Sequence, residues 1–173
     1  MAFDGANIWA IVPGQVAKVR ASDGVVLGRF SLGSVPAGVV FDGANIWVAD
    51  AALDTVTKLR ATDGTVLWTF PVGVQPSGVA FDGANIWVAD LDTVTKLRAS
   101  DGAVLGTVSI KGPTSVLFDG ANIWLTNFGS VTKLRASDGA VLGTFSVGST
   151  PEGMAFDGAN IWVTTNGGSV SKM

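Results

Sequence analysis

The chain reads Phe-Asp-Gly-Ala-Asn-Ile-Trp at residues 3–9, and the same seven residues begin again at Phe41, Phe81, Phe118 and Phe156. The copies start 37 to 40 residues apart in a chain of 173 residues. A period of this length is typical of repeat proteins, in which one supersecondary unit cannot bury its apolar face alone and packs on its neighbours. The heptapeptide therefore predicts one domain built from five related units.

One unit, taken at the third copy, predicts four short strands. Runs rich in apolar, β-branched and aromatic residues cover 77–81, 86–89, 93–98 and 103–110, and Asp-Gly turns follow the first and third runs. The first two runs are apolar almost throughout, which is typical of strands covered on both faces. Pro71 lies in the fourth run of the second unit, where it indicates an edge strand. The unit is therefore expected to be an antiparallel meander that leads from a buried centre to an exposed rim.

A four-stranded meander repeated at this period fits the blade of a β-propeller. We expect an all-β, single-domain propeller with five antiparallel blades, at residues 1–33, 34–73, 74–111, 112–148 and 149–173. The last blade is expected to lack its outer strand. A solenoid is the alternative, but it requires parallel strands and longer crossovers. The incomplete blade leaves two arrangements open: a monomer closed by packing of the first blade on the last, or a homo-oligomer formed through the incomplete blade.

Each unit repeats an aromatic residue inside an apolar strand, and we expect these side chains to pack between successive blades. The equivalent residues are Trp9, Trp47, Trp87, Trp124 and Trp162. The alternative is that they line a sugar or peptide site. Trp68 is different, because other units have Gly at its position. It serves either local packing or assembly.

The run at 76–90, Pro-Ser-Gly-Val-Ala-Phe-Asp-Gly-Ala-Asn-Ile-Trp-Val-Ala-Asp, is followed by Thr-Val-Thr-Lys-Leu-Arg and Val-Leu-Gly-Thr-Val. This pattern resembles the YVTN-type and NHL-type β-propeller repeats of bacteria, and its blades are similar to those of the virginiamycin B lyase family. The resemblance covers the whole chain and implies a periplasmic, secreted or cell-surface location. It is weak for function, because the same blade serves many activities. The near-identity of the units departs from most such proteins and indicates a recently amplified or designed sequence.

Composition restricts the chemistry. The net charge is −3 and no basic stripe is present, which argues against nucleic acid as a partner. Asp-Gly turns interrupt every apolar run, so no membrane insertion is expected. The chain has no His, Cys or Tyr, which removes Ser-His triads and thiolate zinc sites. The lyases that the blades resemble are understood to use a histidine, and no residue here can take that role. We therefore expect a non-enzymatic binding scaffold, with a metal-dependent lyase or lactonase as an alternative.

Two polar sets recur at fixed places. An aspartate precedes Gly in each heptapeptide, and a ring of these carboxylates has the oxygen ligands that Ca²⁺ prefers. The alternative is that each caps its own turn. No other cofactor is expected. The third strands carry a Lys and an Arg, such as Lys58 and Arg60, which we expect to pair with hairpin acids such as Asp63. The candidate calcium ligands are Asp4, Asp42, Asp82, Asp119 and Asp157.

The units differ most in the connections from second to third strand and from one unit to the next. In a meander these connections lie on the same face, and repeat proteins often place binding there. The expected ligand is a protein, a peptide or a small molecule. Simple loop variation is the alternative, in which case the chain is a purely structural or self-assembling propeller. The candidate ligand-binding residues are Asp50, Asp54, Asp90, Asp92, Asn127, Phe128 and Glu152.

Overall fold

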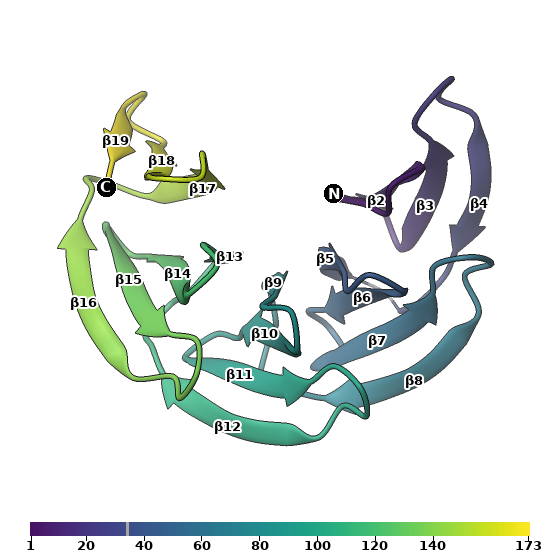
Figure 1. The fold of residues 1–173 in the computed structure, drawn as a ribbon, viewed down its shortest axis with the longest axis horizontal. Coiled ribbons are helices and arrows are strands. Elements are labelled where there is room, and N and C mark those ends of the chain that lie inside the picture. Colours follow the sequence, from purple (N-terminus) through teal and green to yellow (C-terminus); the bar gives the residue numbers. More distant parts are fainter. Residues whose placement is uncertain (34) are drawn as a thin grey trace.

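The structure is a computed structural model that describes residues 1–33 and 35–173. Ser34, with which the second unit was expected to begin, lies outside the described residues. Within the described ranges, 19 strands form five antiparallel sheets arranged about a common axis (Figure 1). The chain therefore has the all-β propeller architecture that its repeats predict, with each sheet as one blade.

Each blade is a meander whose strands follow chain order from the axis to the rim. Blade 1 contains β1 (Ala2–Phe3), β2 (Asn7–Val12), β3 (Gln15–Arg20) and β4 (Val26–Phe30). Blade 2 contains β5 (Pro36–Phe41), β6 (Asn45–Asp50), β7 (Thr55–Arg60) and β8 (Val66–Pro71). Blade 3 contains β9 (Gly78–Phe81), β10 (Asn85–Ala89), β11 (Thr93–Arg98) and β12 (Val104–Ser109). Blade 4 contains β13 (Ser115–Phe118), β14 (Asn122–Asn127), β15 (Ser130–Arg135) and β16 (Val141–Ser146). Blade 5 contains β17 (Pro151–Phe156), β18 (Ile161–Thr165) and β19 (Val170–Lys172).

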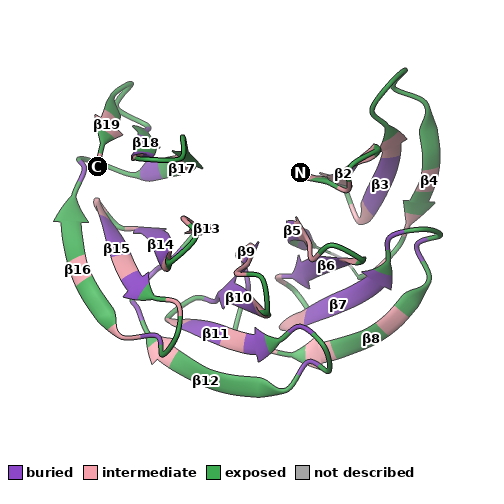
Figure 2. Ribbon diagram, in the orientation of Figure 1, coloured by how far each residue is buried: buried purple, intermediate pink, exposed green. Residues whose placement is uncertain are grey.

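Burial within a blade follows the polarity gradient of the sequence. The first strands line the axis, and the fourth strands β4, β8, β12 and β16 form the rim (Figure 1). Buried residues concentrate in the second and third strands of the central blades (Figure 2), because neighbouring blades cover both faces of these strands. Pro71 ends the rim strand β8, as expected for a residue that has no backbone N–H to donate.

Tryptophans fill the joints between successive blades. Trp9 packs with Ile46 and Leu59 of blade 2, and the next two joints repeat this arrangement with Trp47 and Trp87. These three indoles are 0% exposed. Burial of a tryptophan removes roughly 200 Å² from water, so the joints supply much of the apolar burial that stabilises the fold.

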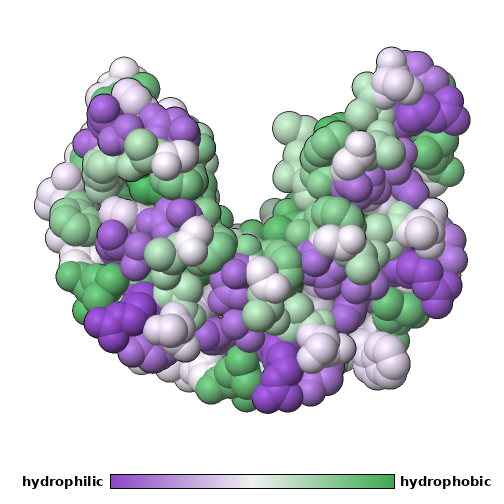
Figure 3. Space-filling model, in the orientation of Figure 1, coloured by the Kyte–Doolittle hydropathy of each residue, from purple (hydrophilic) through white to green (hydrophobic). Residues whose placement is uncertain are grey.

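Blade 5 is less complete than the other blades. Trp124 of blade 4 is 6% exposed, but Trp162 of blade 5, on which no other blade packs in the described residues, is 38% exposed. Among the strands of the described residues, blade 5 has three and no fourth, as the sequence predicts. Blades 1 and 5 stand apart, with an open space between them (Figure 3), so they do not close the ring by packing on each other. In the described part of the chain, no helix has the length and apolar character needed to cross a membrane.

Candidate functional site

The repeated aspartate organises the turn between the first and second strands. Asp82 accepts hydrogen bonds from the backbone N–H groups of Ala84 and Asn85 at 2.9 and 2.7 Å, and from the Asn85 side-chain amide. Its Oδ2 atom also accepts a hydrogen bond of 2.7 Å from Trp87 Nε1. The other four blades repeat this aspartate–tryptophan bond at 2.7 to 2.8 Å. The heptapeptide therefore encodes both the turn and the position of the indole.

These hydrogen bonds keep the aspartates ionised. Burial of Asp4 disfavours its charged form, but hydrogen bonds from Trp9, Ala6 and Asn7 outweigh burial and lower its pKa to about 2. The pKa values of the equivalent aspartates in blades 2, 3 and 4 are lowered against the same opposing effect of burial. In blade 5 the hydrogen bond from Trp162 is the largest cause of the low pKa of Asp157.

The proposed calcium ligands do not converge on a common point. Each aspartate directs its oxygens to donors of its own hairpin. Among residues 1–33 and 35–173, no three acidic side chains lie close enough together to hold one metal ion. The geometry favours the turn-capping role for these residues, and the calcium hypothesis stays a prediction for experiment.

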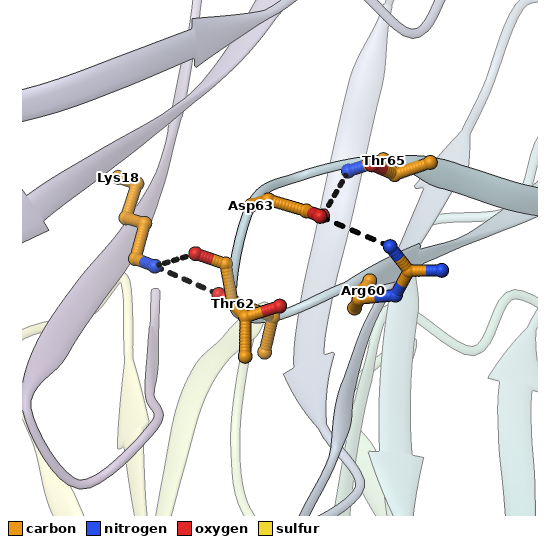
Figure 4. Close-up of polar contacts among 6 residues, drawn as sticks. Lys18, Arg60, Thr62, Asp63 and Thr65 are labelled. Carbon is orange, nitrogen blue, oxygen red and sulfur yellow. Dashed lines mark hydrogen bonds and ion pairs between the residues drawn. The ribbon is translucent and has the colours of Figure 1, made fainter.

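The lysines of the third strands join neighbouring blades. Lys18 Nζ donates to the carbonyl oxygens of Ala61 and Thr62 in blade 2, at 2.8 and 2.9 Å (Figure 4). The same ammonium lies 5.3 Å from the ring centre of Trp9. Lys58 and Lys96 repeat these contacts at the next two joints.

The expected pairing of the basic residues is therefore right for Arg and wrong for Lys. Arg60 pairs with Asp63 at 3.0 Å on the surface (Figure 4), and each of the first four blades has such a pair. The lysines bind backbone carbonyls instead, because the long stem crosses the indole and ends at the next blade's hairpin. These lysines therefore stabilise the joints between blades.

One pocket along the axis is lined by apolar residues. It has a volume of about 380 Å³ and is formed by first-strand residues of blades 1 to 4, among them Phe3, Phe41, Phe81 and Phe118. Every residue that lines this pocket in the described chain is apolar. The side chains around this pocket therefore include no acid, base or nucleophile.

The loops at the end of the blades away from the Asp-Gly turns form one continuous face. Leu91 N–H donates to the Val74 carbonyl at 2.7 Å, and Gly112 N–H donates to the Leu91 carbonyl at 3.1 Å. Ala51 N–H donates to Val35 in the same way at 2.9 Å. Connections within blades and connections between blades are thus bonded to each other. We call the surface formed by residues 31–33, 35, 51–54, 72–77, 90–92, 110–114, 128–129 and 147–152 the loop face.

Large apolar side chains are exposed on the loop face. Leu53 is 54% exposed, Val74 57%, Leu91 48% and Phe128 80%. These four side chains belong to blades 2, 3 and 4, and we call them the apolar row. Apolar side chains that are exposed on hydrogen-bonded loops are typical of binding surfaces, because a docked partner removes their apolar area from water.

The structure separates the candidate ligand-binding residues into two groups. Asp50 and Asp90 are buried, and their carboxylates form hydrogen bonds within the loops. Asp50 accepts hydrogen bonds from the N–H groups of Ala52 and Leu53. Asp90 accepts bonds from the hydroxyls of Thr93 and Thr95, the latter at 2.6 Å. Burial, assisted by the nearby charge of Asp54, raises the pKa of Asp90.

The remaining candidates lie at or near the surface. Asp54 accepts a bond of 2.8 Å from the N–H of Gln75, and the Asn127 amide pairs with the Thr132 hydroxyl. Asp92, Phe128 and Glu152 are exposed. Of the apolar row, only Phe128 was among the sequence candidates, and Leu53, Val74 and Leu91 were not. The signal was present in the Asp-Leu-Asp run at 90–92, where an apolar residue lies in a loop between two acids.

Comparison with known proteins bears on the fold. No protein-family model matches the chain, and no curated protein is similar to it in sequence. Among solved structures, the chain is similar to Kuenenia stuttgartiensis hydrazine synthase, with a TM-score of 0.84 and 21% identity over 94% of this chain. It is also similar to streptogramin B lyase, with a TM-score of 0.76 and 19% identity over 99% of this chain.

The likeness is one of fold. The chain spans 53% of the hydrazine synthase chain and 66% of the lyase chain. The match to the lyase agrees with the resemblance of this chain's repeats to lyase blades. Both matches support a propeller built from repeated blades. The activities named for these proteins belong to them.

Proposed function

We propose that the chain is a non-enzymatic propeller module that binds a protein or peptide through the loop face. One observation carries this proposal: the loops in which the repeats differ present the apolar row to solvent while they are hydrogen-bonded to one another. Loops held in this way lose little conformational entropy when a partner docks on them.

The charges around the apolar row define the partner further. Asp54, Asp92 and Glu152 lie on the loop face, with Lys111 as the basic residue of its inter-blade connections. A partner with apolar side chains and a basic residue complements this surface, because apolar contact supplies affinity and charge supplies orientation. A peptide in an extended conformation fits a row that crosses three blades.

The chemistry of the chain supports a binding role over an enzymatic one. Its carboxylates in the hairpins are engaged by turn donors, and the pocket along the axis has apolar walls. A metal-dependent lyase or lactonase needs ligands and an acid or base around one point. We place the protein outside the cytoplasm and attribute the near-identical units to amplification or design of one blade, both on the basis of the resemblance of the repeats.

Selection of peptides on the immobilised protein tests the proposal. Peptides are selected from a displayed random library, and their affinities are then measured for the wild-type chain and for Phe128→Ser with Leu91→Ser. We expect the double substitution to weaken binding by at least about tenfold, since each side chain contributes on the order of 1 kcal/mol of apolar contact. Trp68→Ser is the matched control, because Trp68 is also exposed but lies on the rim strand β8.

Two results would contradict the proposal. The first is selected peptides that bind the double variant as well as the wild-type chain, or that lose affinity only with Trp68→Ser. The second is hydrolytic or lyase turnover that EDTA abolishes, which would favour the enzymatic alternative.

A further inference from the structure

Blade 5 exposes the outer edge of its third strand, which a fourth strand covers in the other blades. Within the described chain, β19 pairs with β18 on one side and with no strand on the other. Ser169 and Met173 form backbone hydrogen bonds with β18: the Ser169 carbonyl accepts from Thr165 N–H, and Met173 N–H donates to the Ile161 carbonyl. Because backbone groups alternate in direction along an antiparallel strand, those of Val170 and Lys172 point to the open edge.

Uncovered apolar side chains lie at the same edge. Trp162 is 38% exposed, whereas its four counterparts are at most 6% exposed. Val170 is 62% exposed, although the equivalent valines are 0% exposed. Those four buried valines are Val16, Val56, Val94 and Val131. An unpaired backbone edge and an uncovered apolar patch therefore coincide on blade 5.

The complete blades show what covers this place. In blade 4, β16 pairs with β15 so that Gly143 lies opposite Lys133 and Phe145 lies opposite Val131. The Phe145 ring centre lies 6.0 Å from that of Trp124. In blades 1 and 2 the corresponding phenylalanine stacks on the tryptophan at 5.4 and 5.6 Å.

The residue two positions before the aromatic one differs among the blades. A Cβ atom at Gly143 would lie 3.1 Å from the Phe145 ring, and one at Gly28 would lie 2.9 Å from the Phe30 ring. In blade 2, Trp68 takes this position opposite Lys58, and Phe70 still stacks on Trp47. The feature that blades 1, 2 and 4 share is therefore the aromatic residue, and a strand that completes blade 5 in the same way places one opposite Val170.

We propose that β19 and Trp162 form a docking site for an extended segment of a partner polypeptide that places an aromatic residue opposite Val170. The segment adds a fourth strand to blade 5 and continues the sheet as β16 does in blade 4. Main-chain hydrogen bonds from Val170 and Lys172 give affinity, and stacking on Trp162 gives selectivity. The site is separate from the loop face, so each can be tested alone.

A synthetic peptide tests the docking site. The probe is a fluorescently labelled peptide with the sequence of residues 140–148, Ala-Val-Leu-Gly-Thr-Phe-Ser-Val-Gly, titrated with the full chain and followed by anisotropy. We expect saturable binding below about 1 mM. The same peptide with serine in place of its phenylalanine is expected to bind about tenfold more weakly, because the aromatic contact with Trp162 is lost.

Two variants of the chain locate the binding. Lys172→Pro removes an N–H that points to the open edge and leaves the bonds of Ser169 and Met173 to β18, so peptide affinity should fall by at least about tenfold. Thermal unfolding checks that this variant is folded. Trp68→Ser on the rim strand β8 should leave peptide affinity unchanged.

The proposal is overturned if no saturable binding occurs, if the serine peptide binds equally well, or if folded Lys172→Pro binds the peptide as the wild-type chain does. Sedimentation supplies a further test. A dimer that Lys172→Pro abolishes, in the absence of peptide binding, would identify a second copy as the occupant and would also overturn the proposal.

Discussion

Trp87 Nε1 donates a hydrogen bond of 2.7 Å to Asp82 Oδ2, and this bond ties the core of one joint to the turn of the same blade. The indole is buried, while the carboxylate lies at the edge of the joint. Because the bond recurs in all five units, the aspartate of the heptapeptide has a structural role that its place before Gly does not reveal.

Replacement of this aspartate should destabilise the protein. Asp82→Ala leaves the indole N–H and two turn amides without their acceptor, which costs about 2 kcal/mol. Asp101→Ala is the matched control, because Asp101 also precedes Gly but pairs with Arg98 on the surface. We expect a clearly smaller loss for the control in denaturant unfolding. Equal losses would show that the bond to Trp87 contributes little.

Acid should unfold the protein through these carboxylates. Hydrogen bonding lowers the pKa of Asp4 from 3.8 to about 2, and the pKa values of Asp42, Asp82 and Asp119 are also lowered. A group with a lowered folded-state pKa contributes stability above about pH 4 and loses it as the pH falls toward its folded-state pKa. Stability should therefore fall steeply between about pH 4 and pH 2.

Asp90 acts in the opposite sense, because burial raises its pKa and its protonation favours the folded state. Its contribution is lost as the pH rises through that raised value. Melting temperatures measured from pH 2 to pH 7 check the balance. A melting temperature that does not fall below pH 4 would contradict the dominance of the turn aspartates.

The lysine at a joint should matter more than the arginine two residues later. Lys96 donates to the carbonyls of Ala136 and Ser137 in blade 4, so Lys96→Met leaves two acceptors unpaired at a cost of about 2 kcal/mol. Arg98 forms an exposed pair, and Arg98→Met should change stability little. Urea unfolding of the two variants checks the order, and the reverse order would refute the joint role of the lysine.

One joint can be improved. Val108 occupies the position at which Phe30 and Phe70 stack on tryptophans, and a pocket of about 210 Å³ lies beside it against Trp87 and Gly139. Val108→Phe should fill this pocket and raise stability by about 1 kcal/mol, since Gly139 leaves room for the ring. Val104→Phe on the exposed rim is the control. A loss of stability for Val108→Phe would mean that the joint is too narrow for the ring.

Calcium should leave the protein unchanged. A ligand present at 100 times its dissociation constant stabilises the folded state by about 2.7 kcal/mol, which a thermal scan detects readily. Because turn donors already engage Asp4, Asp42, Asp82, Asp119 and Asp157, we expect the same melting temperature with added Ca²⁺ and with EDTA. A shift in either condition would support the calcium site.

The repeat, the strand order and the missing outer strand of blade 5 could all be read from the sequence. Period and turn residues are local, and each Asp-Gly hairpin fixes the pairing of the strands that it joins. The burial of Trp9, Trp47 and Trp87 follows from the same periodicity, because every unit must cover the face of the next.

Only the tertiary structure shows which polar side chains are buried or form hydrogen bonds between blades. Asp50 and Asp90 look like surface loop residues in the sequence but are buried, and the joint lysines reach carbonyls about 40 residues away. It also decided that Trp162 stays uncovered. Sequence spacing determines neighbours along a strand, whereas contacts between blades depend on how the sheets are placed about the axis, and no local pattern of residues encodes that placement.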